Sequence, residues 1–366
     1  MSRNHNQIIM KHNFGPGPCI LPPEVYQQAA EAVLNYNNTG LSILEISHRS
    51  KEFIAVVEET KALLRELLSV PDNYSILLLH GGARQQFALA PLNLQATNAF
   101  SAYLDSGSWS YKAIKEAEKF GEVRVVASSK AQNYTHIVKD FDIPKEACYF
   151  HYTSNNTIFG TELFETPKSP VPIVCDMSSD ILSRKIDVSE FGLIYAGAQK
   201  NIGPAGLTVV IVKDSLLGKT DRNIPGIFDY REHIKADSMF NTPPVYAIYV
   251  AMLNLRWLRA KGGLEEIERE NIIKARKLYE EIDRNPLFTG AAAAEDRSRM
   301  NVTFVASTPE IEAEFLSFAQ DRGIVGIKGH RSVGGFRASL YNGLPLTSVH
   351  FLVDTMQEFS EKYKKS

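Results

Sequence analysis

Residues 170–180 read PVPIVCDMSSD, and residues 191–212 read FGLIYAGAQKNIGPAGLTVVIV. Short apolar runs of this kind, rich in valine and isoleucine and followed by small residues and glycines, are typical of strands buried on both faces. The first run ends at Asp176, and Lys200 lies just beyond the second. The stretch therefore predicts strands of an α/β fold that bring ionisable side chains to the carboxyl ends.

The same rhythm extends over residues 75–213, where apolar runs alternate with turn residues and amphipathic stretches. Seven candidate strands lie at residues 75–80, 99–105, 122–128, 147–153, 170–176, 191–197 and 206–212. Because helical patterns are interleaved with these runs, we expect an α/β fold with a mainly parallel seven-stranded sheet covered on both faces.

Helical periodicity predicts helices at residues 109–121, 241–263 and 265–285, the second with Asn or Thr caps and prolines in its first turn. A strand-like run, a helix, a glycine-rich segment and a final amphipathic helix follow. At 366 residues the chain exceeds one typical core. We expect a large domain over residues 14–262 and a small α+β C-terminal domain over residues 263–366, with residues 1–13 packing on the small domain.

The composition is that of an ordinary globular enzyme, with 44% hydrophobic and 22% charged residues and a formal net charge of −2. No block of basic residues indicates nucleic-acid binding, and no segment has the apolar length of a membrane span or a signal peptide. Cys19, Cys148 and Cys175 are far apart, which argues against a disulfide framework or a metal site. We therefore expect a cytosolic protein.

Asp176 and Lys200 together suit one cofactor, pyridoxal 5'-phosphate (PLP). An aldehyde cofactor needs an amine that holds it as a Schiff base, and its pyridine ring needs a carboxylate that keeps the nitrogen protonated. Small residues around Lys200 leave space beside the amine, and burial would lower its pKa. The alternatives are a lysine at an ordinary strand-to-loop junction and an aspartate that caps the turn at Ser178 and Ser179.

Two further segments fit such a site. His80, Gly81 and Gly82 follow a strand and lead into a helical stretch at residues 85–95, so a phosphate could bind at the helix start. Pro91 should kink or shorten that helix. Trp109, flanked by glycine and serines, could lie flat against an aromatic ring. A plain tight turn and a core tryptophan are the alternative interpretations.

Cations form the last group of candidates. His48 and Arg49 occur in one segment, and His330, Arg331 and Arg337 occur in another. Guanidinium groups bind carboxylates and phosphates with two hydrogen bonds, so these side chains indicate a doubly anionic substrate. Arg231, Arg256 and Arg259 are instead expected in surface ion pairs.

From about Asn13 to the C-terminus, the chain resembles the phosphoserine aminotransferase family, which are fold-type-I PLP enzymes of aminotransferase class V. The segments that carry the resemblance are EISHRSKEF (45–53), GGARQQFALAPLNL (81–94), CDMSSD (175–180), YAGAQKNIGPAGLTVVIV (195–212), NTPPVYAIY (241–249) and KGHRSVGGFRASLYNG (328–343). The resemblance implies a homodimer with shared active sites.

By this resemblance Lys200 is the catalytic residue that binds the cofactor covalently, and Asp176 binds the pyridine nitrogen. The other cofactor-binding residues implied are Ala83, Arg84, Trp109, Thr157, Gln199, and, from the partner subunit, Asn241 and Thr242. Arg337 is assigned to the substrate α-carboxylate. His48, Arg49, His330 and Arg331 are assigned to the distal phosphate or carboxylate, some of them across the subunit boundary.

The activity implied is reversible amino transfer from L-glutamate to 3-phosphohydroxypyruvate in serine biosynthesis, with 4-phosphohydroxy-L-threonine in pyridoxine biosynthesis as a second substrate. An alanine–glyoxylate-type transaminase is the alternative within the fold, and a noncatalytic scaffold is the alternative outside it. A cysteine desulfurase is disfavoured because no cysteine follows Cys175. The chain departs from the family at Gly15, where a serine is common, and at Ala83 and Gln85, where glycine is frequent.

Overall fold

The computed structural model of the protein describes residues 11–365. All seven expected strands are present in one sheet, in the order β2-β8-β7-β6-β5-β3-β4. β8 is antiparallel to both of its neighbours, whereas the remaining pairings are parallel. The strands are β2 (Tyr74–His80), β3 (Phe100–Asp105), β4 (Glu122–Ser128), β5 (Phe150–Thr153), β6 (Ile173–Asp176), β7 (Leu193–Gly197) and β8 (Leu207–Lys213). The prediction of a mainly parallel seven-stranded sheet is therefore confirmed.

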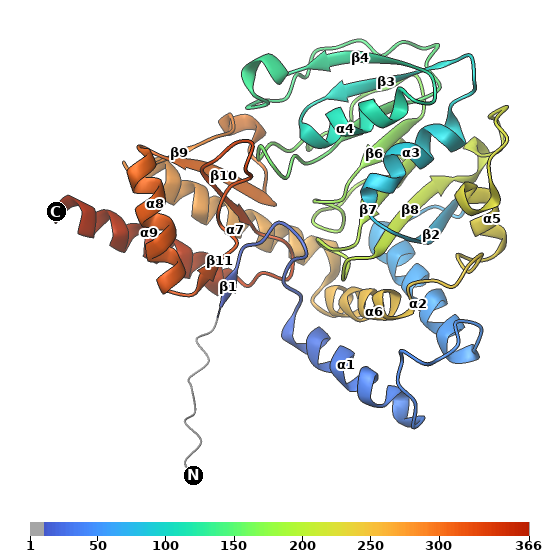
Figure 1. Cartoon of the computed structure of the whole chain (residues 1–366), viewed down its shortest axis with the longest axis horizontal. Helices are drawn as coiled ribbons and strands as arrows, with labels where there is room; N and C mark the ends of the chain where they lie inside the picture. The colour runs from blue at the N-terminus through green and yellow to red at the C-terminus, as the bar shows by residue number, and fades with distance from the viewer. Residues whose placement is uncertain (1–10, 366) are drawn as a thin grey trace.

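Helices cover both faces of this sheet (Figure 1). Alternate strand residues such as Leu78 and Ile194 pack in one core, and their neighbours Leu77 and Leu193 pack in another. The first core is closed by α1 (Pro23–Leu34), α2 (Lys51–Leu68) and α6 (Val245–Ala260), and the second by α3 (Ala83–Leu94), α4 (Ser108–Ala117) and α5 (Tyr230–Lys235). Burial on both faces explains why the inner strands are continuous apolar runs, whereas the edge strand β4 has no buried residue.

A second, smaller sheet forms the C-terminal part of the chain. Its order is β12-β10-β9, and it is antiparallel throughout. It consists of β9 (Phe288–Gly290), β10 (Asn301–Ala306) and β12 (Phe336–Ser339), and it packs with α8 (Pro309–Asp321) and α9 (Leu346–Lys365). Short 3-10 helices occur at Tyr36–Asn38, Lys130–Gln132, Val188–Glu190, Asp214–Leu216, Gly226–Phe228 and Ala294–Asp296.

The N-terminal segment joins this C-terminal part. β1 (His12–Asn13) pairs in parallel with β11 (Ile324–Val325), and Phe14 is fully buried in the core around the small sheet. Residues 1–10, which belong to the segment expected to pack here, lie outside the described residues.

The long helix α7 (Gly263–Arg284) contributes to both parts of the molecule (Figure 1). Leu264 and Ile267 pack in the core beneath the large sheet, whereas Leu278 and Ile282 pack in the core around the small sheet. The division of the chain at residue 262 stays a prediction, because this helix belongs to both cores.

Two local expectations differ from the structure. Pro91 does not shorten α3, which continues to Leu94 and ends at Gln95, whose amide donates to the Pro91 carbonyl at 3.0 Å. Helix α6 begins at Val245, so both prolines precede it and no side chain caps it. Among the described helices, none has the length and apolar character needed to cross a membrane.

Candidate active site

The expected site lies where the parallel strands of the large sheet end. His80, Thr153, Asp176 and Gly197 are the last residues of four strands that run in the same direction, and ligands of α/β sheets bind beyond such ends. A cavity of about 160 Å³ opens there. Its walls are Gly82, Ala83, Arg84, Phe87, Trp109, Thr153, Asn155, Thr157, Asp176, Ser178, Ser179, Gln199 and Lys200.

Lys200 lies in the loop between β7 and β8, and its amine lines the cavity. Nζ donates to Thr157 Oγ1 at 3.0 Å and to Ser179 Oγ at 2.8 Å. Burial lowers the pKa of Lys200 to about 8, although the negative charge of Asp176 acts in the opposite direction. Roughly a tenth of the amine is therefore neutral at pH 7, where an ordinary lysine is almost wholly protonated. A nucleophile toward an aldehyde must be neutral.

Asp176 both caps a turn and faces the cavity. Its Oδ1 accepts hydrogen bonds from the Ser178 amide at 3.0 Å and the Ser178 hydroxyl at 2.6 Å. Its Oδ2 has no hydrogen-bond donor among the residues described. Burial raises the pKa of Asp176, while the charge of Lys200 lowers it. A protonated ring nitrogen at Oδ2 would supply both the missing donor and a favourable charge.

The backbone on both sides of Lys200 is held in place. The Cys19 amide donates to the Gln199 carbonyl at 3.1 Å, and the Cys19 thiol donates to the Lys200 carbonyl. Asn201 Nδ2 donates to the carbonyls of Ser179 and Ile181, both at 3.1 Å. These bonds fix the lysine loop relative to the segment that follows Asp176.

The start of α3 provides an anion-binding end to the cavity. Gly81 has a φ of +92°, a conformation that favours glycine, and Gly82 is the N-cap of the helix. The amides of Ala83 and Arg84 lie in the first turn, where no helical carbonyl can accept from them. With the guanidinium of Arg84 and the amide of Gln199 in the same wall, this end can bind a phosphate group.

Trp109 and Thr153 carry polar atoms that are buried without a partner. Trp109 Nε1 and Thr153 Oγ1 have no hydrogen bond among the described residues, although both side chains line the cavity. Such unpartnered groups are costly unless a ligand satisfies them. A buried amine, a carboxylate, an aromatic ring and free helix amides therefore fit the chemistry of PLP.

Arg337, on β12 of the small sheet, lies on another side of Lys200. Its Nη1 donates to the Thr157 carbonyl at 3.3 Å, and its buried Nε has no partner among the residues described. Thr157 thus contacts both Arg337 and Lys200. Burial lowers the pKa of this guanidinium, which a carboxylate ligand would offset.

Seven of the expected residues do not line this cavity, namely Arg337, His330, Arg331, His48, Arg49, Asn241 and Thr242. His48 and Arg49 lie in the turn before α2. Asn241 and Thr242 are exposed before α6, and Asn241 Nδ2 lies 3.4 Å from His80 Nδ1 in a neighbouring cavity of about 210 Å³.

His330 and Arg331 precede β12 in an exposed loop. Burial, followed by the charges of Arg337, Lys112 and Arg331, lowers the pKa of His330. This loop therefore lies near the Arg337 side of the site. Arg231, Arg256 and Arg259 form ion pairs with Asp229, Glu59 and Glu66, as expected.

Several cavity residues were missed in the sequence. Ser179 binds Lys200 and lies 2.6 Å from Thr157 Oγ1, and Phe87, Asn155, Thr153 and Ser178 complete the walls. Ser178 and Ser179 lie two and three positions after Asp176 in the sequence, so they could have been predicted to lie near its carboxylate. Nothing in the sequence marked Phe87 and Asn155 as cavity residues, because buried aromatics and polar loop residues are common.

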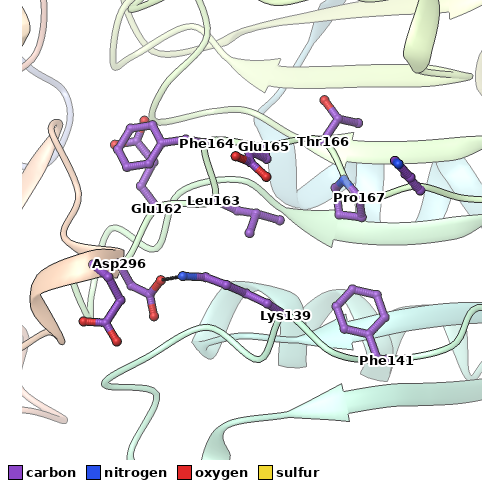
Figure 2. Close-up of a pocket in the computed structure, with 11 residues that line it drawn as sticks. Lys139, Phe141, Glu162, Leu163, Phe164, Glu165, Thr166, Pro167 and Asp296 are labelled. Carbon is purple, nitrogen blue, oxygen red and sulfur yellow. Dashed lines mark ion pairs between the residues drawn. The ribbon is translucent and has the colours of Figure 1, made fainter.

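Figure 2 shows a second cavity, of about 450 Å³. It shares no wall residue with the cavity of Lys200. Lys139 and Asp296 form an ion pair of 2.6 Å at its edge. Glu162, in its wall, is only 2% exposed, and burial raises the pKa of its carboxyl. Arg184 lies 3.7 Å from Glu162 and 3.6 Å from Asp180, so buried charges extend from this cavity toward the segment after Asp176.

The fold and the lysine–aspartate site define an aminotransferase of class V, and the model of the class-V aminotransferase family matches residues 12–350. The chain is 57% identical to the phosphoserine aminotransferase of Flavobacterium johnsoniae, over 97% of this chain and all of that one. It belongs to the phosphoserine aminotransferase family.

Solved structures agree with this assignment. The phosphoserine aminotransferase of Bacillus circulans subsp. alkalophilus superposes with a TM-score of 0.94 and is 42% identical, covering 97% of this chain and 99% of that one. The PLP-bound enzyme of Trichomonas vaginalis gives a TM-score of 0.88 at 37% identity, covering 95% of this chain and 100% of that one.

Proposed function

We propose that the protein is a PLP-dependent phosphoserine aminotransferase that moves an amino group reversibly from L-glutamate to 3-phosphohydroxypyruvate. The observation that carries this proposal is that Lys200 and Asp176 line one cavity. Arg337 lies close to them, because it donates a hydrogen bond to the Thr157 carbonyl while Lys200 donates one to the Thr157 hydroxyl. The relatives named phosphoserine aminotransferase support the choice of substrate and disfavour the alanine–glyoxylate alternative.

The residues that would hold PLP come from separate segments of the cavity wall. Lys200 would bind it covalently, Asp176 would bind the pyridine nitrogen, Trp109 would stack on the ring and Thr157 would contact it. Ala83, Arg84 and Gln199 would bind the phosphate. When bound, the cofactor supplies an aldehyde for the substrate amine and a ring that withdraws electrons from the substrate Cα.

The protein's own groups then bind the substrate and move its proton. Arg337 binds the α-carboxylate, because its buried Nε is free to donate. Lys200 Nζ removes the proton from the substrate Cα as a general base and later returns a proton as a general acid. A pKa lowered to about 8 suits both directions of transfer near neutral pH.

The distal anion is assigned to His48, Arg49, His330 and Arg331. Glutamate carries a carboxylate at that position and the phosphorylated substrate carries a phosphate, so one cluster of donors has to accept either anion. A second phosphorylated substrate, 4-phosphohydroxy-L-threonine, would fit the same donors. We also propose that the protein is cytosolic, as the sequence leads us to expect.

A homodimer with shared sites is part of the same proposal. Exposed apolar side chains lie near two of the site segments in the sequence, the segment of His48 and Arg49 and the segment of Asn241 and Thr242. Leu41 and Leu44 precede His48 and are 48% and 62% exposed, and Phe240, next to Asn241, is 44% exposed. Apolar side chains exposed beside polar site residues are expected where a second copy covers the surface.

The proposed activity is tested with O-phosphoserine and 2-oxoglutarate, by measuring the glutamate formed after addition of PLP. Wild-type protein should turn over, and Lys200→Ala should lose at least about 10³-fold in kcat, because both covalent binding and proton transfer are removed. Lys185→Ala, a change in a surface lysine that pairs with Glu265, is the matched control. Absence of wild-type turnover, or an undiminished Lys200→Ala rate, would contradict the proposal.

A further inference from the structure

One lysine outside the residues assigned so far lies against a wall residue of the site. Lys112 follows Trp109 by one turn of α4, and its Nζ lies 4.4 Å from the centroid of the Trp109 ring. Trp109 itself lines the cavity that holds Lys200. The ammonium of Lys112 is thus held over an aromatic ring beside the active site, where the ring quadrupole attracts it.

Lys112 differs from the other lysines of this region. Lys115 pairs with Glu118 at 2.8 Å, and Lys119 pairs with Glu116 at 2.6 Å, as is usual for a solvated helix face. Within the part of the chain that the structure describes, Lys112 has no carboxylate partner. Its carboxylate neighbours on the helix are already used by the other two lysines.

The charges around Lys112 are positive. Burial, followed by the charges of Arg84 and Arg331, lowers its pKa, and the charge of Lys112 in turn lowers the pKa of His330. Arg84, Arg331 and Arg337 also have no ion pair with a described carboxylate. These positive charges repel one another, so an anion that binds among Lys112, Arg84 and Arg331 would relieve the repulsion.

We propose that Lys112 is a specificity-determining residue that binds the distal phosphate of the substrate together with His330 and Arg331. The inference rests on the proposed function, since it adds a binding residue to the distal site of the same reaction. An ammonium is a compact charge with three donors, and a phosphate offers it more charge and more acceptors than the γ-carboxylate of glutamate does. Lys112 therefore favours the phosphorylated substrate over the carboxylate one.

The test compares Lys112→Met with wild type in the presence of saturating PLP. We expect the KM for O-phosphoserine to rise by about 10-fold or more, since a charge-assisted hydrogen bond is lost. The KM for glutamate should change by less than about 3-fold, because a singly charged group gains less from the same cation. Lys112→Arg should restore most of the preference, and Lys115→Met, on the same helix, should behave as wild type.

Inhibition by inorganic phosphate gives a second readout, and its inhibition constant should rise in Lys112→Met. An equal rise in both KM values would overturn the proposal. So would a weakened affinity for PLP with unchanged substrate KM values, which would assign Lys112 to the cofactor phosphate. Wild-type turnover with an unchanged Lys112→Met refutes this inference alone, whereas absence of wild-type turnover refutes the proposed function and this inference together.

Discussion

At the scale of single residues, the amine of Lys200 and the carboxylate of Asp176 shift in opposite directions from their ordinary pKa values toward neutral forms. The common cause is burial, which disfavours both charged states. The charges of the two groups partly offset that penalty. The site therefore suits a ligand that places a positive charge next to Asp176 and forms a covalent bond with the amine of Lys200.

The lowered pKa of Lys200 can be measured on the protein without cofactor. Acetylation of each lysine by trace acetic anhydride, followed by mass spectrometry, reports the neutral fraction as the pH rises. Labelling of Lys200 should increase with an inflection near pH 8, because the depressed pKa releases the proton early. Asp176→Asn should move the inflection lower still, since the opposing negative charge is removed.

Lys115 serves as the internal reference in that experiment. Its hydrogen bond to Glu118 raises its pKa above the ordinary value of 10.5, so its labelling should increase at higher pH than that of Lys200. An inflection for Lys200 near 10.5 would contradict the assignment of a desolvated amine.

At the scale of elements, the connection between β12 and α9 is attached to α7 by a buried lysine. Lys274 is 1% exposed, and its Nζ donates to the carbonyls of Leu340 and Tyr341 at 2.9 Å and of Leu344 at 3.2 Å. Burial lowers its pKa to about 7. Because this connection follows the strand of Arg337, the three bonds also fix the end of β12.

Lys274→Met should lower the free energy of unfolding by about 2 kcal/mol or more, because it removes three hydrogen bonds to buried backbone carbonyls while keeping a similar side-chain volume. Urea titration followed by circular dichroism measures the change. Lys277→Met, a change in a partly exposed lysine of the same helix, should stay within about 0.5 kcal/mol of wild type. Equal stability of the two variants would show that the lysine bonds contribute nothing net.

The sequence predicted the elements better than it predicted their ends. Most of the strands are buried apolar runs, and the exposed edge strand β4 was visible from its valines, so all seven were predicted. Asp176 and Lys200 could be placed because one ends such a run and the other follows one. The prediction that Pro91 shortens its helix was wrong, because α3 tolerates a proline in its last turns. The hydrogen bonds of Ser179 with Lys200 and Thr157 join residues about 20 positions apart in the sequence. No periodicity in the sequence predicts contacts of this kind.

At the scale of the whole molecule, the residues assigned to one site are separated in a single chain. Lys200 and Arg337 lie together, whereas Arg49 and Asn241 lie outside the cavity next to exposed apolar side chains. A second copy that covers those surfaces would bring the missing groups to each site.

Mixing two inactive variants tests this arrangement. Lys200→Ala and Arg49→Ala, denatured and refolded together, should regain about a quarter of the wild-type sites, since each mixed dimer contains one site with both native residues. Lys200→Ala with Arg84→Ala should regain nothing, because both residues serve the site of their own chain. No recovery in the first mixture would contradict shared sites.

The shared helix α7 has a consequence for how the chain folds. Its first turns complete the core beneath the large sheet, and its last turns complete the core around the small one. Melting of either core withdraws packed side chains from the other. We therefore expect loss of packing in one core to destabilise the other, so that removal of the C-terminal part should lower the stability of the large sheet.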